Sequence, residues 1–134
     1  MLLTLCAEAL VRAGRYLEAE RLLDRTTDLE KKARVHTFNA EVFRLRGLIV
    51  LHTASADQAR AEDCFTSAIN VARAQSARAF ELRTSMDLAR MYRDQGRPKQ
   101  GHDLLVGIYG AFTEGFDWPD LKAAKALLAD LGAR

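Results

Sequence analysis

A short pattern of residues recurs three times along this chain. Each copy has a small residue, a large apolar residue four positions later, and another packing residue three positions after that. The three trios are Ala19, Leu23 and Thr26, then Ala61, Phe65 and Ala68, then Gly101, Leu105 and Ile108. They recur at intervals of roughly 40 residues, in the range of repeats built from one pair of helices. The pattern therefore predicts an all-α chain in which each helical pair buries its apolar face against a neighbour.

A related pattern precedes each trio, with a small residue three positions before a large one. The pairs are Ala7 with Leu10, Gly47 with Val50, and Ala89 with Tyr92. Small residues at such positions let two helices cross closely. The interval from the small residue to its trio is longer in the middle copy than in the other two, so the middle turn is expected to hold two extra residues.

Apolar residues at spacings of three and four predict seven helices. Their expected ranges are about 2–13, 16–26, 37–52, 55–74, 78–95, 98–112 and 119–131. Thr26 and Thr27 are expected to fray the second helix, because threonine favours caps and turns. Ser55 and Gln58 have the spacing of a capping box at the start of the fourth helix.

Composition excludes several classes of protein. The 134 residues carry a net charge of only +2, which argues against direct binding of nucleic acid. No apolar run approaches the length of a membrane span, and no basic segment precedes an apolar run as in a signal peptide. Cys6 and Cys64 fall on apolar stripes and are expected to be core residues in a reducing compartment. We therefore expect a single cytoplasmic domain.

Two turns carry a resemblance to a known family. Gly14-Arg15-Tyr16 and, more loosely, Gly96-Arg97-Pro98 match the glycine-aromatic turn of tetratricopeptide repeats. The period here is longer than that family's repeat of roughly 34 residues, and its opening tryptophan is absent. The resemblance implies an α-α superhelix of about three helical hairpins within one domain, 1–134. Its repeats would cover about 1–34, 35–76 and 77–116, with a capping helix at about 118–132.

A narrower resemblance covers the last third of the chain. It is carried by Glu81-Leu82-Arg83, Leu88-Ala89-Arg90, Arg93-Asp94-Gln95-Gly96-Arg97 and Phe112-Thr113-Glu114-Gly115-Phe116-Asp117. This segment is similar to the C-terminal tetratricopeptide region of large bacterial signalling proteins, which carry a nucleotide cyclase or DNA-binding head and a P-loop ATPase. Trp118 departs from them, since a small hydroxyl residue usually stands there. The resemblance implies a regulatory module or a regulatory C-terminal fragment.

The residues needed for catalysis are not grouped in this sequence. It has no phosphate-binding loop, metal-ligand run or nucleophile elbow. His36, His52 and His102 are far apart, and Cys64 belongs to a packing face, which argues against pairing with His102 as nucleophile and base. We therefore expect a protein that is not an enzyme, with no catalytic residue, cofactor or metal site.

The fifth predicted helix carries a basic stripe. Arg83, Met86, Arg90 and Arg93 are spaced 3, 4 and 3, which places them on one face. In tetratricopeptide arrays this face lines the concave groove. The third helix would add Glu41, Arg44, Leu48 and His52, and the first helix Thr4, Glu8 and Arg12.

Such a groove would be mildly basic with an apolar floor. Guanidinium groups bind carboxylates through two parallel hydrogen bonds, so an acidic segment of a protein partner is the expected ligand. The alternative is that Asp87 and Asp94 complete surface pairs with these arginines.

The two ends of the predicted array raise separate expectations. Phe112, Phe116 and Trp118 are expected to seal the last repeat beneath the closing helix, with an exposed aromatic docking site as the alternative. The first helix has no expected cover on its apolar side. We expect either docking on a second copy, giving a homodimer or a self-associating structural module, or upstream repeats in a longer ancestor.

Overall fold

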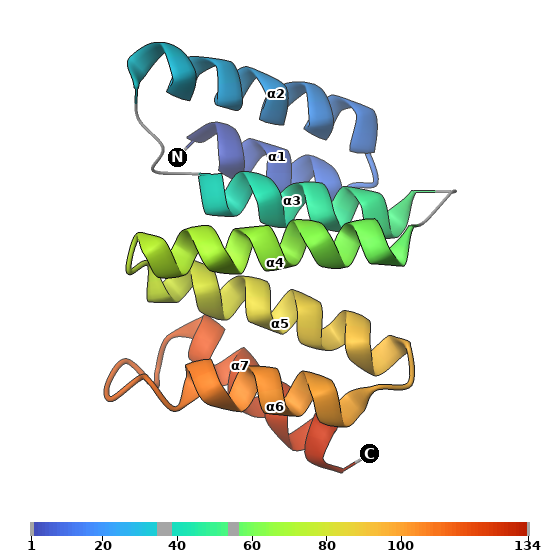
Figure 1. Ribbon diagram of the computed structural model, residues 1–134, viewed down its shortest axis with the longest axis vertical. Helices are drawn as coiled ribbons and strands as arrows, with labels where there is room; N and C mark the ends of the chain where they lie inside the picture. The colour runs from blue at the N-terminus through green and yellow to red at the C-terminus, as the bar shows by residue number, and fades with distance from the viewer. Residues whose placement is uncertain (1, 35–38, 54–56, 134) are drawn as a thin grey trace. The chain divides into compact units, whose positions relative to one another are not determined.

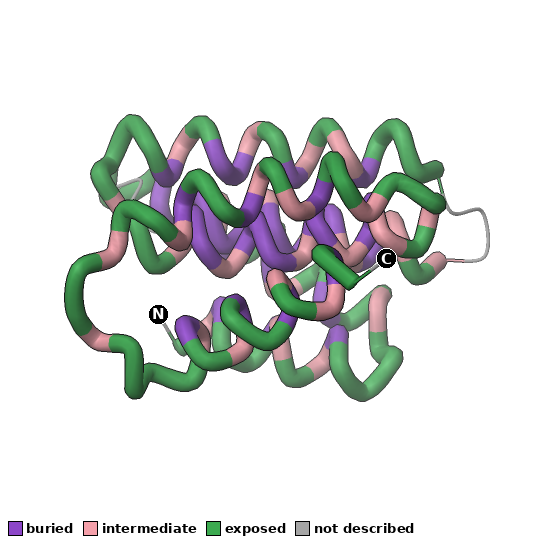
Figure 2. Tube along the Cα trace, turned by 90° about the horizontal axis from the view of Figure 1, so that it is seen from below, coloured by how far each residue is buried: buried purple, intermediate pink, exposed green. Residues whose placement is uncertain are grey.

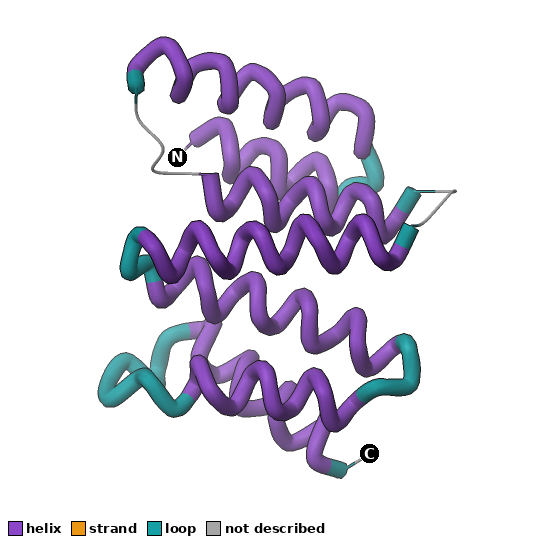
Figure 3. The backbone as a smooth tube through the Cα atoms, in the orientation of Figure 1, coloured by secondary structure: helices purple, strands orange, loops and turns teal. Residues whose placement is uncertain are grey.

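The computed structural model describes residues 2–34, 39–53 and 57–133. These residues form seven helices and no strand, which confirms the all-α prediction (Figures 1 and 3). The helices are α1 (Leu2–Arg12), α2 (Tyr16–Ala33), α3 (Asn39–His52), α4 (Gln58–Ala74), α5 (Arg78–Asp94), α6 (Pro98–Tyr109) and α7 (Pro119–Gly132). None of the described helices combines the length and the apolar character that a membrane span needs.

The chain forms two compact units, Met1–Ala74 and Gln75–Arg134. In the first unit α1 packs on α2, α3 packs on α4, and α3 also contacts both helices of the first pair. Its central cluster consists of Ala7, Val11, Ala19, Leu23, Val42, Leu45 and Ile49. In the second unit α5 packs on α6, and α7 packs on both. Its cluster consists of Leu82, Met86, Ala89, Leu105, Ile108, Leu121, Ala124, Leu127 and Leu131.

All nine residues of the three trios are buried. Buried positions recur along each helix (Figure 2), as expected for helices with an apolar face. In α3 and α5 they include continuous runs, 40–42 and 84–86. The close crossing predicted at Ala89 is confirmed, because a Cβ on Gly101 would lie 2.9 Å from the carbonyl oxygen of Ala89. The repeat therefore identifies the faces that build both cores.

The turn after α1 and the turn after α5 have the same geometry. Gly14 and Gly96 have φ angles of 76° and 78°, which a residue with a Cβ adopts only with strain. The amide of Arg15 donates to the carbonyl of Leu10 at 2.9 Å, and the amide of Arg97 donates to the carbonyl of Tyr92 at 2.8 Å. Each glycine amide also donates to a carbonyl of the preceding turn. Together these bonds form a Schellman motif, which ends a helix and satisfies its last carbonyls.

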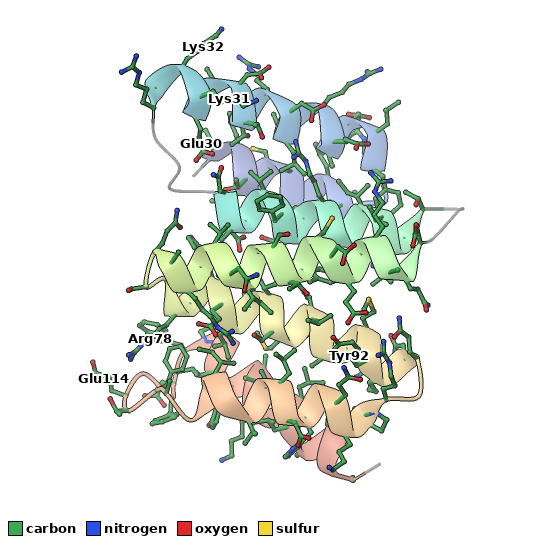
Figure 4. All side chains as sticks on the ribbon, viewed as in Figure 1. Glu30, Lys31, Lys32, Arg78, Tyr92 and Glu114 are labelled. Atoms are coloured by element: carbon green, nitrogen blue, oxygen red, sulfur yellow. The ribbon has the colours of Figure 1, made fainter. Side chains whose placement is uncertain are left out.

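The predicted end of the second helix was wrong. The helix continues past Thr26 and Thr27 to Ala33, because both hydroxyls donate to carbonyls one turn earlier, at 2.9 and 3.0 Å. A threonine satisfied in this way is compatible with a helix interior. Figure 4 labels Lys31 and Lys32 in the last turn of α2, where positive charge complements the helix dipole.

The start of α4 differs from its predicted capping. Ser55 lies outside the described residues. The Asp57 side chain instead accepts a hydrogen bond from the amide of Arg60 at 3.1 Å, which is the geometry of an N-cap. The fourth helix is therefore capped two residues later than the sequence predicted.

The expected burial of Cys6 was also wrong, since this residue is exposed while Cys64 is partly buried. Burial raises the pKa of the Cys64 thiol, with a smaller contribution from Asp63 and opposing contributions from Arg60 and Arg46. Cys6 lies on the side of α1 opposite Ala7 and Val11, which face the core. Its exposure is the first sign that this side of α1 is uncovered.

The three aromatic residues after α6 do not act together as a seal. Phe112 packs against the core of the second unit, as expected, but Phe116 and Trp118 are 47% and 57% exposed. The Phe116 ring lies 6.0 Å from that of Tyr109, and a Cβ on Gly115 would lie 3.4 Å from the Trp118 ring. Figure 4 labels Arg78 at the start of α5 and Glu114 in this loop, and Arg78 donates to the carbonyl of Ala111 at 3.4 Å.

Candidate functional site

The predicted arginine stripe of α5 faces α7. The Arg83 Nη2 atom lies 3.1 Å from Oδ2 of Asp120, and the Arg93 Nη1 atom lies 3.2 Å from Oδ2 of Asp130. Met86, between them, is 3% exposed and belongs to the core of the second unit. The chain's own last helix therefore contacts this stripe at both ends and covers its middle.

The remaining charges on the stripe are also matched within the chain. Arg90 lies 3.2 Å from Asp87, one turn earlier. Arg93 also lies 3.1 Å from Asp94, and the hydrogen bond from Arg93 to Asp94 is the main reason that the pKa of Arg93 is raised. The three arginines thus contact four aspartates, Asp87, Asp94, Asp120 and Asp130, so this face has no excess of positive charge.

Two magnitudes indicate what holds α7 in place. Partly exposed ion pairs contribute about 0–1 kcal/mol each. Burying one leucine side chain contributes about 1.5–3 kcal/mol, and α7 buries Leu121, Leu127 and Leu131. The leucines therefore supply most of the docking energy, and the arginines fix the position of α7 along α5.

The predicted groove residues of the first unit lie on α1 and α3. On α1, Thr4 is 3% exposed, and Arg12 pairs with Glu8 at 3.1 Å. The Arg44 side chain is 3% exposed and pairs with Glu41 of α3 and Glu8 of α1. Leu48 is partly buried and packs against the core. His52 is exposed at the end of α3, and its ring stacks on that of Tyr16 with centroids 6.2 Å apart.

Seven of the predicted groove residues divide between the two units as follows. Arg44, Leu48 and His52 belong to the first unit, and Arg83, Met86, Arg90 and Arg93 belong to the second. Arg44 and Met86 are buried, and the arginines Arg83, Arg90 and Arg93 contact aspartates of the same unit. The predicted arginines therefore form ion pairs inside their own units.

A different surface lies on α1, where the sequence predicted an uncovered apolar side but not the residues that form it. We call it the α1 outer face; it comprises Leu2, Leu5, Cys6, Ala9 and Ala13, all exposed. Leu2 is 73% exposed and Leu5 is 50% exposed. At 100° per residue these positions share one side of the helix, opposite the buried Ala7 and Val11. The signal in the sequence is that Glu8 and Arg12 are the only charged residues of α1.

The helix α3 shows what covers the equivalent face in the same unit. When Ala7 is aligned with Gly47, the small residue of the next copy, the residues equivalent to Leu2, Leu5 and Ala9 are Val42, Leu45 and Ile49. All three α3 residues are buried in one cluster with Ala7, Val11, Ala19 and Leu23 of the first helical pair. The face that packs on a helical hairpin in α3 is thus open to solvent in α1.

Other parts of the structure offer little for chemistry. Among the described residues, no group of three or more His, Cys, Asp or Glu side chains is placed to hold a metal ion. A pocket of about 250 Å³ lies between the start of α6 and the end of α7, lined by Pro98, Lys99, His102, Asp103, Leu131 and Gly132. The Lys99 ammonium there lies 3.8 Å from Asp103.

Comparison with known proteins gives no relative. No protein-family model, curated protein or solved structure matches the chain.

Proposed function

We propose that this chain is a non-enzymatic protein-interaction module of the tetratricopeptide-like type, and that it binds protein through the α1 outer face. The observation that carries the proposal is the contrast between α1 and α3. Both helices are apolar on opposite sides, yet only α3 has both sides covered. A helix that is apolar all round is normally a buried helix. The composition of α1 is therefore that of a helix buried on both sides, although one of its sides is exposed to solvent.

The energetics favour occupation of this face by protein. Leu2 is largely exposed and Leu5 half exposed, next to the small residues Cys6, Ala9 and Ala13. Contiguous exposed apolar surface of this kind marks interaction sites on soluble proteins. Burying a fully exposed leucine contributes about 1.5–3 kcal/mol. The exposed parts of Leu2 and Leu5 contribute in proportion, which is a useful part of the binding free energy.

The shape of the face favours a helical partner. In α3 the equivalent residues pack on Ala7 and Val11 of one helix and on Ala19 and Leu23 of the next. A partner helix that presents small and medium apolar residues at spacings of three and four would fill the α1 outer face in the same way. The partner class we infer is therefore a helix or helical hairpin.

A second candidate function is a regulatory C-terminal part of a nucleotide cyclase or P-loop ATPase signalling protein. The resemblance of residues 81–117 supports it, and this stretch lies within the unit formed by α5–α7. In that setting the module would still act by binding, and the face on α1 would contact a neighbouring helical segment of the larger protein.

The proposal is tested by protecting the Cys6 thiol. The Cys64→Ser chain, with a reference thiol introduced by Thr113→Cys, is labelled with a maleimide at low concentration, alone and in a lysate of the source cell. We expect the ratio of Cys6 labelling to reference labelling to fall in the lysate. Leu5→Glu should restore the ratio, whereas Leu17→Glu, at a leucine that is 63% exposed on α2, should leave the protection intact. An unchanged ratio in lysate would contradict the proposal.

A further inference from the structure

We propose that the partner of the α1 outer face is a second copy of this chain, with the two α1 helices packed antiparallel about a two-fold axis. This inference rests on the proposed function, because it names the occupant of that same face. Its carrying observation is the distribution of side-chain size along the face. The large residues Leu2 and Leu5 lie in the first half of α1, and the small residues Ala9 and Ala13 lie in the second half or just after it.

Antiparallel pairing makes this face complementary to itself. With the axis between Cys6 and Ala9, Leu2 of one copy meets Ala13 of the other, and Cys6 meets Ala9. Leu5 lies between the levels of Ala9 and Ala13 of the other copy, so both leucines pack against small residues, as interdigitated helix packing requires. Parallel pairing would place Leu2 against Leu2 and leave the alanines with no large side chain to fill the space between them. A two-fold interface uses the same patch on both copies, so self-complementarity is its main requirement.

The charges on α1 do not oppose such a pair. No member of the α1 outer face is charged, and Arg12, which borders it beside Leu5 and is 79% exposed, lies at opposite ends of the interface in the two copies, so the axis brings no two like charges together. The carboxylate of Glu8 lies 3.4 Å from the buried Arg44 and 3.1 Å from Arg12. Both charged residues of α1 thus have contacts within their own unit, and these contacts can remain when the two copies bind.

The size of the face sets the expected strength. A helix of 11 residues is about 16 Å long, and stable interfaces bury about 800 Å² on each partner. One face of a helix this short buries less than that amount. We therefore expect a dimer that dissociates in the micromolar range and whose population rises with protein concentration.

The primary test is sedimentation velocity of the full chain from about 5 to about 500 µM, a range that brackets micromolar dissociation. We expect a concentration-dependent shift from the 15.0 kDa monomer toward twice that mass. Leu5→Glu and, independently, Ala9→Glu should each hold the chain as a monomer, whereas Leu17→Glu should still dimerise. Helical content measured by circular dichroism must be unchanged in all three variants. If either Leu5→Glu or Ala9→Glu loses helical content, the other variant serves as the test.

The orientation has its own test in a background without native thiols, Cys6→Ser and Cys64→Ser. Under oxidation, an equimolar mixture of a Leu2→Cys chain and an Ala13→Cys chain should give a mixed disulfide dimer, and each chain alone should give little cross-linked product. Cross-linking of each variant to itself, without the mixed product, would overturn the antiparallel arrangement.

The outcomes separate this inference from the proposed function. A chain that is monomeric at every concentration, with Cys6 protected in lysate, overturns the homodimer and leaves the face to a different helical partner. A monomer with Cys6 unprotected in both settings overturns both proposals. A dimer that survives both Leu5→Glu and Ala9→Glu places self-association elsewhere and also overturns this inference.

Discussion

Arg44 binds Glu41, one turn earlier on α3, through two parallel hydrogen bonds. Its Nε atom donates to Oε1 at 3.0 Å and its Nη2 atom donates to Oε2 at 2.9 Å. Both side chains are almost fully buried, at 3% and 5% exposure, and Nη2 also lies 3.4 Å from Glu8 of α1. Arg44 was predicted to bind a carboxylate of a partner. It instead binds two carboxylates of its own unit, and its contact with Glu8 joins α3 to α1.

The first prediction concerns this buried pair. Arg44→Met removes the guanidinium from beside a buried carboxylate, so we expect a loss of about 3–5 kcal/mol in the free energy of unfolding. The double change Arg44→Met with Glu41→Leu should recover most of the loss, since neither charge is then buried. Urea unfolding of the three chains measures both effects. Arg12→Met is the matched control, because Arg12 contacts Glu8 from a position 79% exposed, and it should cost less than about 0.5 kcal/mol. A similar cost for the two single changes would contradict the structural role of Arg44.

The second prediction compares two glycines of the same helix. A Cβ on Gly101 would lie 2.9 Å from the Ala89 carbonyl oxygen, whereas a Cβ on Gly107 would meet nothing within 4 Å. Gly101→Ala should therefore push α5 and α6 apart and cost about 1–3 kcal/mol. Gly107→Ala should stabilise the chain by about 0.5–1 kcal/mol, because alanine is the better helix former. Thermal unfolding distinguishes the two, and equal shifts would mean that α5 and α6 are not in close contact at Ala89.

The third prediction concerns the ion pairs between α5 and α7. A double-mutant cycle with Arg83→Gln and Asp120→Asn should give a coupling energy of about 0.2–1 kcal/mol, as expected for side chains that are 31% and 38% exposed. The coupling should shrink in high salt, because partly exposed charges are screened. Leu127→Ala, a change in the core of the same unit, should cost about 2–5 kcal/mol and show little dependence on salt. A coupling energy near zero would show that the Arg83–Asp120 pair does not contribute to the docking of α7.

Sequence patterns predicted the fold where local chemistry decides it. The trios, beginning with Ala19 and Leu23, marked the buried faces because helical spacing alone determines which residues share a side. Gly14 and Gly96 marked two helix ends because a positive φ favours glycine. The prediction failed at Thr26, where the hydroxyl bonds back to its own helix and the expected turn does not form.

The candidate site was harder to predict because its contacts join distant parts of the sequence. Arg83 and Asp120 are 37 residues apart, as are Arg93 and Asp130. Spacing along one helix shows that the arginines share a face, but it does not show which helix covers that face. The sequence predicted an uncovered apolar side on the first helix but did not show which residues form it, because Cys6 was expected in the core and only the structure shows that it is exposed.

The fourth prediction uses the partly buried thiol of Cys64. Burial raises its pKa, so at a given pH less of it is thiolate, and the thiolate is the reactive form. In a Cys6→Ser chain, maleimide labelling of Cys64 at mildly alkaline pH should therefore be slower than labelling of a short cysteine peptide, and its rate should keep rising at pH values where the peptide has levelled off.

The same pKa shift implies a pH dependence of folding. Because the folded state holds the Cys64 proton more tightly than the unfolded state, the stability linked to this proton is complete below the unfolded pKa and is lost as the pH rises through the folded pKa. Unfolding free energies measured from neutral pH upward should fall in the Cys6→Ser chain and fall less steeply when Cys64→Ser is added. Parallel curves for the two chains would show that Cys64 has the same pKa in the folded and unfolded states. In that case Cys64 should also be labelled at the same rate in buffer as in urea, where its burial is lost.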